Sequence, residues 1–128
     1  MVEDTLVDTQ VFLWYSGGSS RLKPWMRTQI EGSRPLLSIA SLWEIAIKSA
    51  IGKLTMHKTF EELAESIESV GFDILPILPK HLIALHSLPY HHRDPFDRLL
   101  IAQSLSEGLP ILTTDDVFDQ YGVNIIGR

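Results

Sequence analysis

The chain has 128 residues, 45% of them hydrophobic and 21% charged, which favours a single globular domain over residues 1–128. The formal net charge of −5 argues against a protein that coats nucleic acid nonspecifically, and the absence of cysteine excludes disulfides, thiolate nucleophiles and cysteine-bound zinc. Because the apolar runs are too short to span a bilayer and no signal-peptide pattern opens the sequence, we expect a cytoplasmic protein without a membrane partner.

Short apolar segments alternate with helical patterns along the whole chain. Strands are predicted over residues 5–8, 36–38, 72–77, 110–115 and 123–126, and helices over residues 10–15, 24–30, 40–51, 59–70, 80–88 and 95–108. Such alternation is typical of a parallel sheet with helices on both faces. We therefore expect a three-layer α/β/α sandwich with a central parallel sheet of about five short strands, the last of them at the edge.

Two predicted helices have apolar positions that we expect to face the core. In the helix over residues 40–51, the expected buried stripe is Ile39, Leu42, Trp43, Ala46, Ile47, Ala50 and Ile51. In the helix over residues 80–88, the expected inward residues are Leu82, Ile83, Leu85 and Leu88. His81 and His86 lack the i, i+4 spacing of a two-histidine metal site, so we interpret them as surface or internally hydrogen-bonded residues.

The helix that begins at Pro95 carries acids at its start. Asp94 precedes the proline and suits the N-cap position, and on its own we interpret it as a cap. Asp97 follows in the first turn, before an apolar run over residues 99–102 that must be buried. Asp97 is therefore held at the positive end of a buried helix.

Three further acids are expected at the same edge of the sheet. Asp8 and Asp115 follow predicted strands, and Glu44 lies in a helix that leaves the sheet where Asp97 does. Taken alone, Glu44 could simply pair with Lys48 one turn later. Four carboxylates in one crevice would repel one another, however, and a hard divalent cation is the natural compensation.

This arrangement suits metal-assisted hydrolysis of a phosphodiester, in which a metal activates water and stabilises charge on the phosphate. We assign Asp8, Glu44 and Asp97 to Mg²⁺ binding, directly or through water, and Asp115 to a second ion or its waters. Glu44 or Asp97 could also orient the attacking water. Thr113 and Thr114 are candidates for hydrogen bonds to the cluster.

Four segments resemble the PIN-domain nucleases, specifically the VapC-type toxins of toxin-antitoxin systems. They are Leu-Val-Asp-Thr at residues 6–9, Ser-Ile-Ala-Ser-Leu-Trp-Glu-Ile-Ala-Ile-Lys at 38–48, Asp-Pro-Phe-Asp-Arg-Leu-Leu-Ile-Ala-Gln at 94–103, and Leu-Thr-Thr-Asp at 112–115 with Phe118. The resemblance covers nearly the whole chain and implies an α/β/α sandwich, a Mg²⁺- or Mn²⁺-dependent endoribonuclease, a homodimer, and a cognate antitoxin. The family's four acids map onto Asp8, Glu44, Asp97 and Asp115, and its Ser/Thr onto Thr113. The roles of Asp94 and Asp116 stay open.

The basic residues offer candidates for contact with RNA. Residues 16–35 hold several cations and one acid, so this segment could face a phosphate backbone or could simply be a solvated helix face. The RNA-contact candidates are Arg21, Lys23, Arg27 and Arg98. Trp14 and Trp43 are expected in the core, whereas Trp25 is the candidate for an antitoxin groove or for base stacking.

Other functions stay open at this point. A metal-independent ribonuclease could use His91 and His92, although adjacent residues on an extended chain point apart. A metal-dependent nuclease could instead cut DNA, or process RNA outside a toxin-antitoxin system. A phosphorylated receiver-like module would need an acidic pair near the first strand end and a lysine near the last strand, and residues 123–128 contain no lysine.

Overall fold

The computed structural model describes residues 2–127, which build one parallel sheet with the strand order β3-β2-β1-β4. The strands are β1 Asp4–Val7, β2 Arg34–Ser38, β3 Asp73–Leu75 and β4 Ile111–Leu112. Leu6 of β1 is in register with Leu36 of β2 on one side and with Ile111 of β4 on the other. Strand β1 is therefore an inner strand: the chain runs from it outward to β2 and β3, and β4 is added later on the other side of β1.

The predicted strand over residues 123–126 does not form a full ladder. It makes one isolated parallel bridge, between Ile125 and Ile111, so the sheet has four strands among the described residues, one fewer than the sequence suggests. The physical reason is the length of β4, which has only two residues and offers little edge for pairing. The residues before the bridge form a short 3₁₀ helix that the sequence analysis did not predict.

The helices follow the predicted order along the chain. They are α1 Thr9–Ser16, α2 Pro24–Glu31, α3 Ile39–Ala50, α4 Phe60–Ser66, α5 Pro79–His86, α6 Pro95–Glu107 and the 3₁₀ helix η1 Asp116–Tyr121. Ser38 caps α3, a capping box between Thr59 and Glu62 starts α4, and the Asp94 side chain caps α6 by accepting from two backbone N–H groups. These side-chain bonds explain why the helix starts were predictable from sequence.

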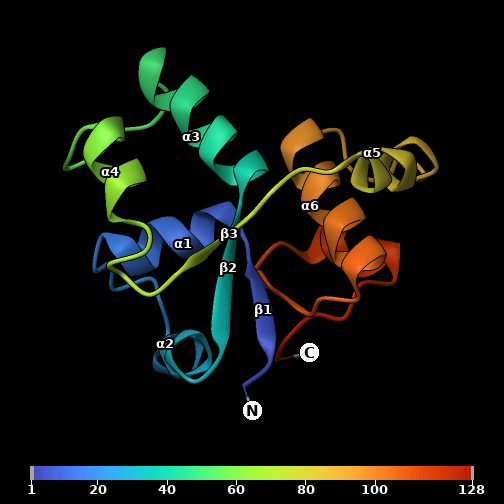
Figure 1. Ribbon diagram of the computed structural model, residues 1–128, viewed down its shortest axis with the longest axis horizontal. Coiled ribbons are helices and arrows are strands. Elements are labelled where there is room, and N and C mark those ends of the chain that lie inside the picture. Colours follow the sequence, from blue (N-terminus) through green and yellow to red (C-terminus); the bar gives the residue numbers. More distant parts are fainter. Residues whose placement is uncertain (1, 128) are drawn as a thin grey trace.

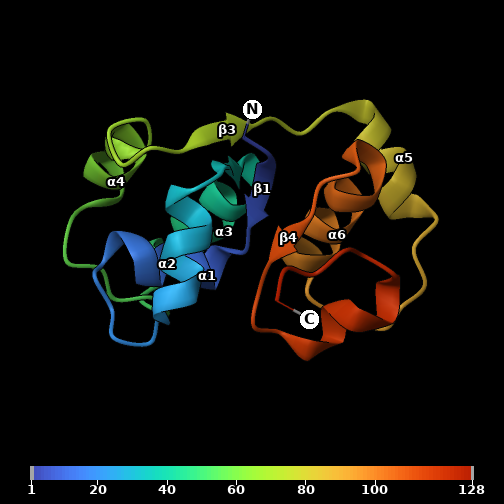
Figure 2. The same ribbon diagram turned by 90° about the horizontal axis from the view of Figure 1, so that it is seen from below.

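Two hydrophobic cores lie on the two faces of the sheet. Alternating strand residues point to opposite faces, so Val7, Leu37 and Leu112 pack with α1, α2 and α4, whereas Leu6, Leu36 and Ile111 pack with α6 and η1. Figure 1 shows the corresponding layers, with α1 and α4 on one side of the strands and α5 and α6 on the other. In Figure 2, the same two groups of helices are again separated by the strands. The predicted three-layer α/β/α sandwich is confirmed.

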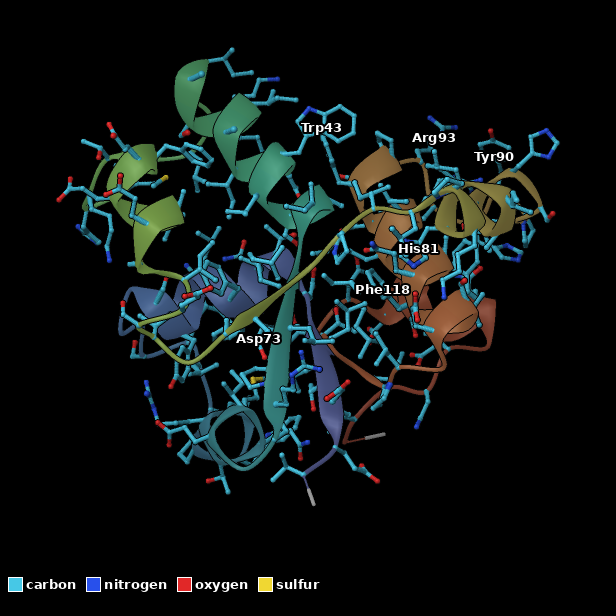
Figure 3. All side chains as sticks on the ribbon, in the orientation of Figure 1. Trp43, Asp73, His81, Tyr90, Arg93 and Phe118 are labelled. Atoms are coloured by element: carbon cyan, nitrogen blue, oxygen red, sulfur yellow. The ribbon has the colours of Figure 1, made fainter. Side chains whose placement is uncertain are left out.

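Helix α3 buries a different face from the one predicted. Its buried residues are Ala40, Ser41, Glu44 and Ile45, whereas Ile39, Trp43, Ile47 and Ile51 are exposed by 37%, 53%, 38% and 60%. The assignment of Trp43 to the core was therefore wrong, and in Figure 3 its indole projects from α3 into the space beside α6. The helix is apolar on more than one face, so periodicity alone could not decide which face the sheet covers.

Helix α5 departs from the prediction in a similar way. Leu82 and Ile83 are exposed, while His81 is completely buried between α5 and α6 (Figure 3). Its Nδ1 accepts from the Leu78 backbone N–H at 2.9 Å, and its Nε2 lies 2.7 Å from Glu107 Oε2. The internal hydrogen bonds of His81 make the burial of a polar ring possible, and hydropathy could not signal them.

None of the helices within residues 2–127 combines the length and the apolar character needed to cross a membrane.

Candidate active site

The candidate site lies at the carboxyl ends of β1 and β4, where the strand order of the sheet reverses. Asp8 directly follows β1, and Thr113 to Asp115 follow β4, the strand that pairs with β1. In open parallel sheets, this kind of switch point opens a crevice at the carboxyl ends of the strands. In Figure 1, α3 extends away from this end of the sheet, whereas α6 begins near it and runs back alongside the strands. The fold therefore brings the four predicted acids to one edge.

Asp8 is nearly buried and is held by a threonine from β4's end. It is 6% exposed, and Thr113 Oγ1 donates to Asp8 Oδ2 at 2.8 Å. Thr9, the first residue of α1, donates its hydroxyl to Ser41 Oγ at 2.7 Å and so joins α1 to α3. Thr113 thus takes the supporting role predicted for it, while the exposed Thr114 lines the pocket instead.

Glu44 points into the same pocket from α3. It is 7% exposed, and Lys48 Nζ donates to its Oε2 at 2.5 Å, so the i, i+4 pair considered in the sequence does form. The other carboxylate oxygen, Oε1, is the buried side-chain nitrogen or oxygen within residues 2–127 that has no hydrogen-bond partner. A buried carboxylate oxygen without a donor is costly unless something else binds it.

Asp97 and Asp115 meet on either side of a histidine. His92 Nε2 lies 3.0 Å from Asp97 Oδ2 and 3.2 Å from Asp115 Oδ2. Ligand atoms of these three residues lie within 4.8 Å of one another. Asp115 also caps η1, because its Oδ1 accepts from the Val117 N–H at 3.0 Å. His91 contacts the Tyr121 ring instead, so the two histidines point apart as expected.

The acids line one pocket of about 400 Å³. Four predicted site acids and two lysines contribute to it, together with residues from the neighbouring helices; the lining residues are Asp8, Thr9, Gln10, Leu13, Glu44, Ile45, Lys48, Lys53, Leu54, Asp94, Asp97, Thr114 and Asp115. Asp116 belongs to the first turn of η1 and does not line the pocket. Asp94 lines it while also capping α6, which matches its interpretation as a cap.

Burial and mutual repulsion change the acidity of two of these groups. Burial raises the pKa of Asp97 to about 8, with further contributions from the nearby carboxylates of Asp8, Asp94, Glu44 and Asp115. Burial also raises the pKa of Asp8 to about 6, and Glu44 adds to this, although the hydrogen bond from Thr113 acts in the opposite direction. Without a cation, the carboxyl groups of Asp8 and Asp97 therefore keep their protons to a higher pH than ordinary aspartates do.

The residues present fit a hard divalent cation. The potential metal ligands are carboxylate oxygens, which Mg²⁺ and Mn²⁺ prefer. Among them, Glu44 Oε1 is buried and has no hydrogen-bond partner, so it can bind a cation. Raised pKa values at Asp8 and Asp97 are the expected signature of acids that lack a compensating charge. The candidate metal site is thus built by four elements that are far apart in sequence.

The predicted RNA-contact residues lie elsewhere. Arg98 is 5% exposed and cannot reach RNA, because its Nη1 donates to the Pro89 carbonyl at 2.8 Å and its guanidinium lies 3.9 Å from the centre of the Tyr90 ring. Arg21, Lys23 and Arg27 are exposed but do not line the pocket, and Arg27 packs over the Tyr15 ring. Helix α2 lies at the opposite end of the strands in Figure 1.

The sequence analysis did not assign three residues to the acidic pocket, although it considered Lys48 as a partner of Glu44 and His92 for a metal-independent ribonuclease. Lys48 and Lys53 are the lysines of the pocket lining, and His92 bridges two of its acids. Lys48 could have been found, since it lies one turn from Glu44 on the same helix face. No local signal marks Lys53 or His92, because the loops that carry them are placed by tertiary contacts.

Comparison with solved structures supports the same architecture. VapBC2 from Rickettsia felis, bound to a DNA fragment from its promoter, matches 95% of this chain and 96% of that chain with 12% identity and a TM-score of 0.71. FitAcB from Neisseria gonorrhoeae matches 94% of this chain and 95% of that chain with 20% identity and a TM-score of 0.64. FitAB bound to an IR36 DNA fragment matches 95% and 93% with 18% identity and a TM-score of 0.68.

At these identities the structural matches establish the fold alone. No match was found among curated protein sequences. The PIN-domain family model, in contrast, matches residues 5–124 and so spans all four acids and every strand but the first residue of β1. The chain therefore belongs to the PIN-domain family, a family of nucleases.

Proposed function

We propose that the chain is a Mg²⁺- or Mn²⁺-dependent endoribonuclease that acts as a toxin and is neutralised by a cognate antitoxin protein. The observation that carries the metal-dependent chemistry is Glu44 Oε1, a buried oxygen without a partner in a pocket that also holds Asp8, Asp97 and Asp115. Family membership supports nuclease activity. The choice of RNA as substrate rests on the resemblance of the four sequence segments to VapC-type toxins.

Each side chain has a task that follows from its contacts. Asp8, Glu44, Asp97 and Asp115 would hold one or two cations, with Thr113 orienting Asp8. A bound Mg²⁺ would make water a better nucleophile near neutral pH and would stabilise charge on the scissile phosphate. Lys48 offsets the charge of Glu44, which in turn raises the pKa of Lys48 through their hydrogen bond.

Substrate phosphates need positive charge near a strongly acidic pocket. Lys48 and Lys53 lie on its wall, and the Lys48 side chain is 40% exposed, so both can face a phosphate backbone that enters from solvent. Asp97, with its pKa raised to about 8, holds a proton that a binding cation must displace. Cation binding and cleavage are therefore expected to strengthen together as the pH rises toward 8.

Partner binding is supported by apolar surface outside the acidic pocket. A cavity of about 210 Å³ adjoins the pocket through Gln10, Leu13 and Leu54 and is also lined by Trp14 and Met56. It suits an apolar side chain of an antitoxin. The similar structures are VapBC2 and FitAB assemblies, which agrees with a two-protein system. Trp25, the residue expected at an antitoxin groove, is 44% exposed but belongs to α2 and does not line this cavity.

The exposed stripe of α3 supports a homodimer. Ile39, Trp43, Ile47 and Ile51 recur every four residues and form one partly exposed apolar row along α3, in which the Trp43 ring also contacts Phe96 of α6 edge-to-face. Rows of this kind on a soluble chain mark surfaces that associate. Light scattering on the purified chain would test this, with dissociation expected for Ile47→Glu and a monomeric wild type contradicting it.

Cleavage of a mixed RNA pool tests the proposed activity. Purified protein, freed of any co-purifying partner, is expected to cut RNA with Mg²⁺ or Mn²⁺ and to stop with EDTA or with Asp8→Asn. Cleavage that survives EDTA would contradict metal dependence, and cleavage of DNA in place of RNA would favour the alternative nuclease function. Growth arrest on expression, relieved by a protein encoded alongside, would support the toxin role.

A further inference from the structure

His92 lies within the acidic cluster, between Asp97 and Asp115. Its imidazole comes from the loop between α5 and α6, is 18% exposed, and inserts Nε2 between Asp97 and Asp115. A histidine and two carboxylates at this spacing could hold a metal ion, with the ring nitrogen as one ligand. They could equally form a hydrogen-bonded unit in which the ring donates to the acids.

The other ring nitrogen decides between these two arrangements. His92 Nδ1 accepts a hydrogen bond from the Asp94 backbone N–H at 3.2 Å, so Nδ1 carries no proton. In a neutral imidazole the proton is then on Nε2, the nitrogen that faces the two acids. Metal ligation through Nε2 would require the proton to move to Nδ1, where it would face the Asp94 N–H group. The contacts therefore make His92 a donor to Asp115 Oδ2, which forms a hydrogen bond with Nε2 at 3.2 Å, while Asp97 Oδ2 lies 3.0 Å from the same nitrogen.

The loop that carries His92 is held by hydrogen bonds to Tyr121 and Arg98. Tyr121 Oη accepts from the backbone N–H groups of His91 and His92 at 2.9 and 2.7 Å. Arg98 Nη1 lies 3.3 Å from the same hydroxyl and donates to the Pro89 carbonyl, while Nη2 donates to the Leu88 carbonyl at 3.4 Å. This buried arginine thus holds the ends of the loop together.

The His92 ring has little freedom to turn away. Phe118 lies edge-to-face with it at a centroid distance of 6.2 Å, and Asp94, whose N–H contacts Nδ1, is itself locked as the α6 cap. Each acid keeps an oxygen that His92 does not contact, and Asp115 Oδ1 is bound by Val117. In both acids it is therefore the Oδ2 atom that faces the His92 ring.

We propose that His92 is a positioning residue whose Nε2–H group bridges Asp97 and Asp115 and keeps these two carboxylates oriented together for a divalent cation. Its N–H group offsets the repulsion between the two carboxylates. This inference rests on the proposed metal-dependent function and adds a residue to that site. Hydrogen-bond partners of metal ligands commonly matter for affinity in this way.

Nuclear magnetic resonance of ¹⁵N-labelled protein tests the proton position directly. The ring nitrogens of His92, assigned by their loss in His92→Ala, are expected to show a bare Nδ1 and a protonated Nε2, both before and after Mg²⁺ is added. Loss of the Nε2 proton on adding Mg²⁺ would identify His92 as a ligand and overturn the proposal, as would a protonated Nδ1.

Calorimetric titration with Mn²⁺ tests the effect on the site. We expect about 10-fold or weaker binding for His92→Ala. His92→Gln, which keeps a donor at similar reach, is expected to retain most of the affinity, and His91→Ala serves as the matched control because its ring contacts Tyr121 and not the acids. Affinity in His92→Ala equal to that of the wild type, or affinity lost equally in His92→Gln, would overturn the bridging role.

The ring-proton measurement and the Mn²⁺ titration together separate this inference from the proposed function. A wild type that does not bind Mn²⁺ would contradict the metal-dependent function and the orienting role, whatever the variants do. The ring-proton measurement would still confirm or overturn the hydrogen bonds by themselves. If His92→Ala fails to fold, His92→Gln also lacks the imidazole, so it assigns the ring nitrogens in the wild-type spectrum and tests the affinity as well.

Discussion

A buried histidine, His81, and a half-buried one, His92, both face carboxylates in this molecule, and their surroundings differ in one respect. Both His81 and His92 accept a backbone N–H at Nδ1 and face a carboxylate with Nε2. Around His81 the polar atoms are paired, because Gln103 reaches the Pro76 carbonyl and accepts from Ser38, and Lys80 binds Glu107. Around His92 the acids outnumber the donors.

The difference appears in the acidity of the two clusters. Hydrogen bonds from His81 and Lys80 lower the pKa of Glu107, whereas burial and neighbouring acids raise the pKa of Asp97 to about 8. The His81 cluster is complete by itself and joins α5, α6 and β2. Next to the His92 cluster, Glu44 Oε1 has no hydrogen-bond partner, and the proposed function assigns a cation to this place. A fully paired network indicates a structural role, and an unpaired one indicates a site.

The largest expected effect comes from Asp97→Asn, which removes charge from the incomplete cluster. RNA cleavage with Mg²⁺ should fall by about 100-fold or more, because a ligand is lost. The thermal midpoint in EDTA should rise, since burial of an acid among acids opposes folding by roughly 1 to 3 kcal/mol. Cleavage assays and thermal melts check both. Glu107→Gln, in the paired cluster, should lower the midpoint and leave cleavage per folded molecule unchanged.

The second effect comes from His81→Ala, which opens the complete cluster. Losing the ring leaves the Leu78 N–H unpaired and creates a cavity, so the free energy of unfolding should fall by about 2 to 4 kcal/mol. Urea denaturation measures this change. Mn²⁺ affinity should stay close to that of the wild type, and a parallel loss of affinity would show that the two clusters are not independent.

The third effect is the pH dependence of stability without metal. Asp8 and Asp97 have pKa values of about 6 and about 8 in the folded chain, above the usual value of about 4 for an unfolded aspartate. The folded state therefore binds more protons, and the free energy of unfolding should decrease as the pH rises, by roughly 2 kcal/mol between about pH 6 and pH 7. Excess Mg²⁺ should cancel or reverse this slope. A flat profile in EDTA would contradict the raised pKa values.

The smallest effect concerns the rim of the acidic cluster. Lys53→Gln should weaken RNA binding by about 2- to 5-fold and reduce the salt dependence, because one phosphate contact is lost. Filter binding with Ca²⁺ in place of Mg²⁺ measures affinity without requiring turnover. Arg21→Gln, outside the pocket, should have little effect; the reverse result would favour the basic segment over residues 16–35 as the RNA surface.

Much of the fold was predictable because its signals are local. Thr59 with Glu62, and Asp94 with Pro95, mark helix starts through hydrogen bonds within one turn. The faces of α3 and α5 were not predictable in the same way. Trp43 and Ile83 are apolar and lie at helical spacing, yet they are exposed, while Glu44 and His81 are buried because partners from other elements receive them.

The candidate site also combines features that were predictable from sequence with features that were not. The types and order of the four acids were readable from the chain, because an acid after an apolar strand or at a helix start is a local pattern. Which cations face the pocket was not: Arg98 is buried under a loop, and Lys48 and Lys53 line the pocket instead. Side-chain direction depends on how helices rotate against the sheet.

The sequence by itself therefore determined the elements, their order and the acids that meet, since caps, apolar periodicity and strand-end residues act over a few positions. Only the tertiary structure decided that the ring nitrogens of His81 are both hydrogen-bonded, that Glu44 keeps one oxygen, Oε1, without a partner, and that His92 enters the acidic cluster. The physical reason is that hydrogen bonding and burial of these groups depend on atoms many residues away, which come together only when the sheet and its helices pack.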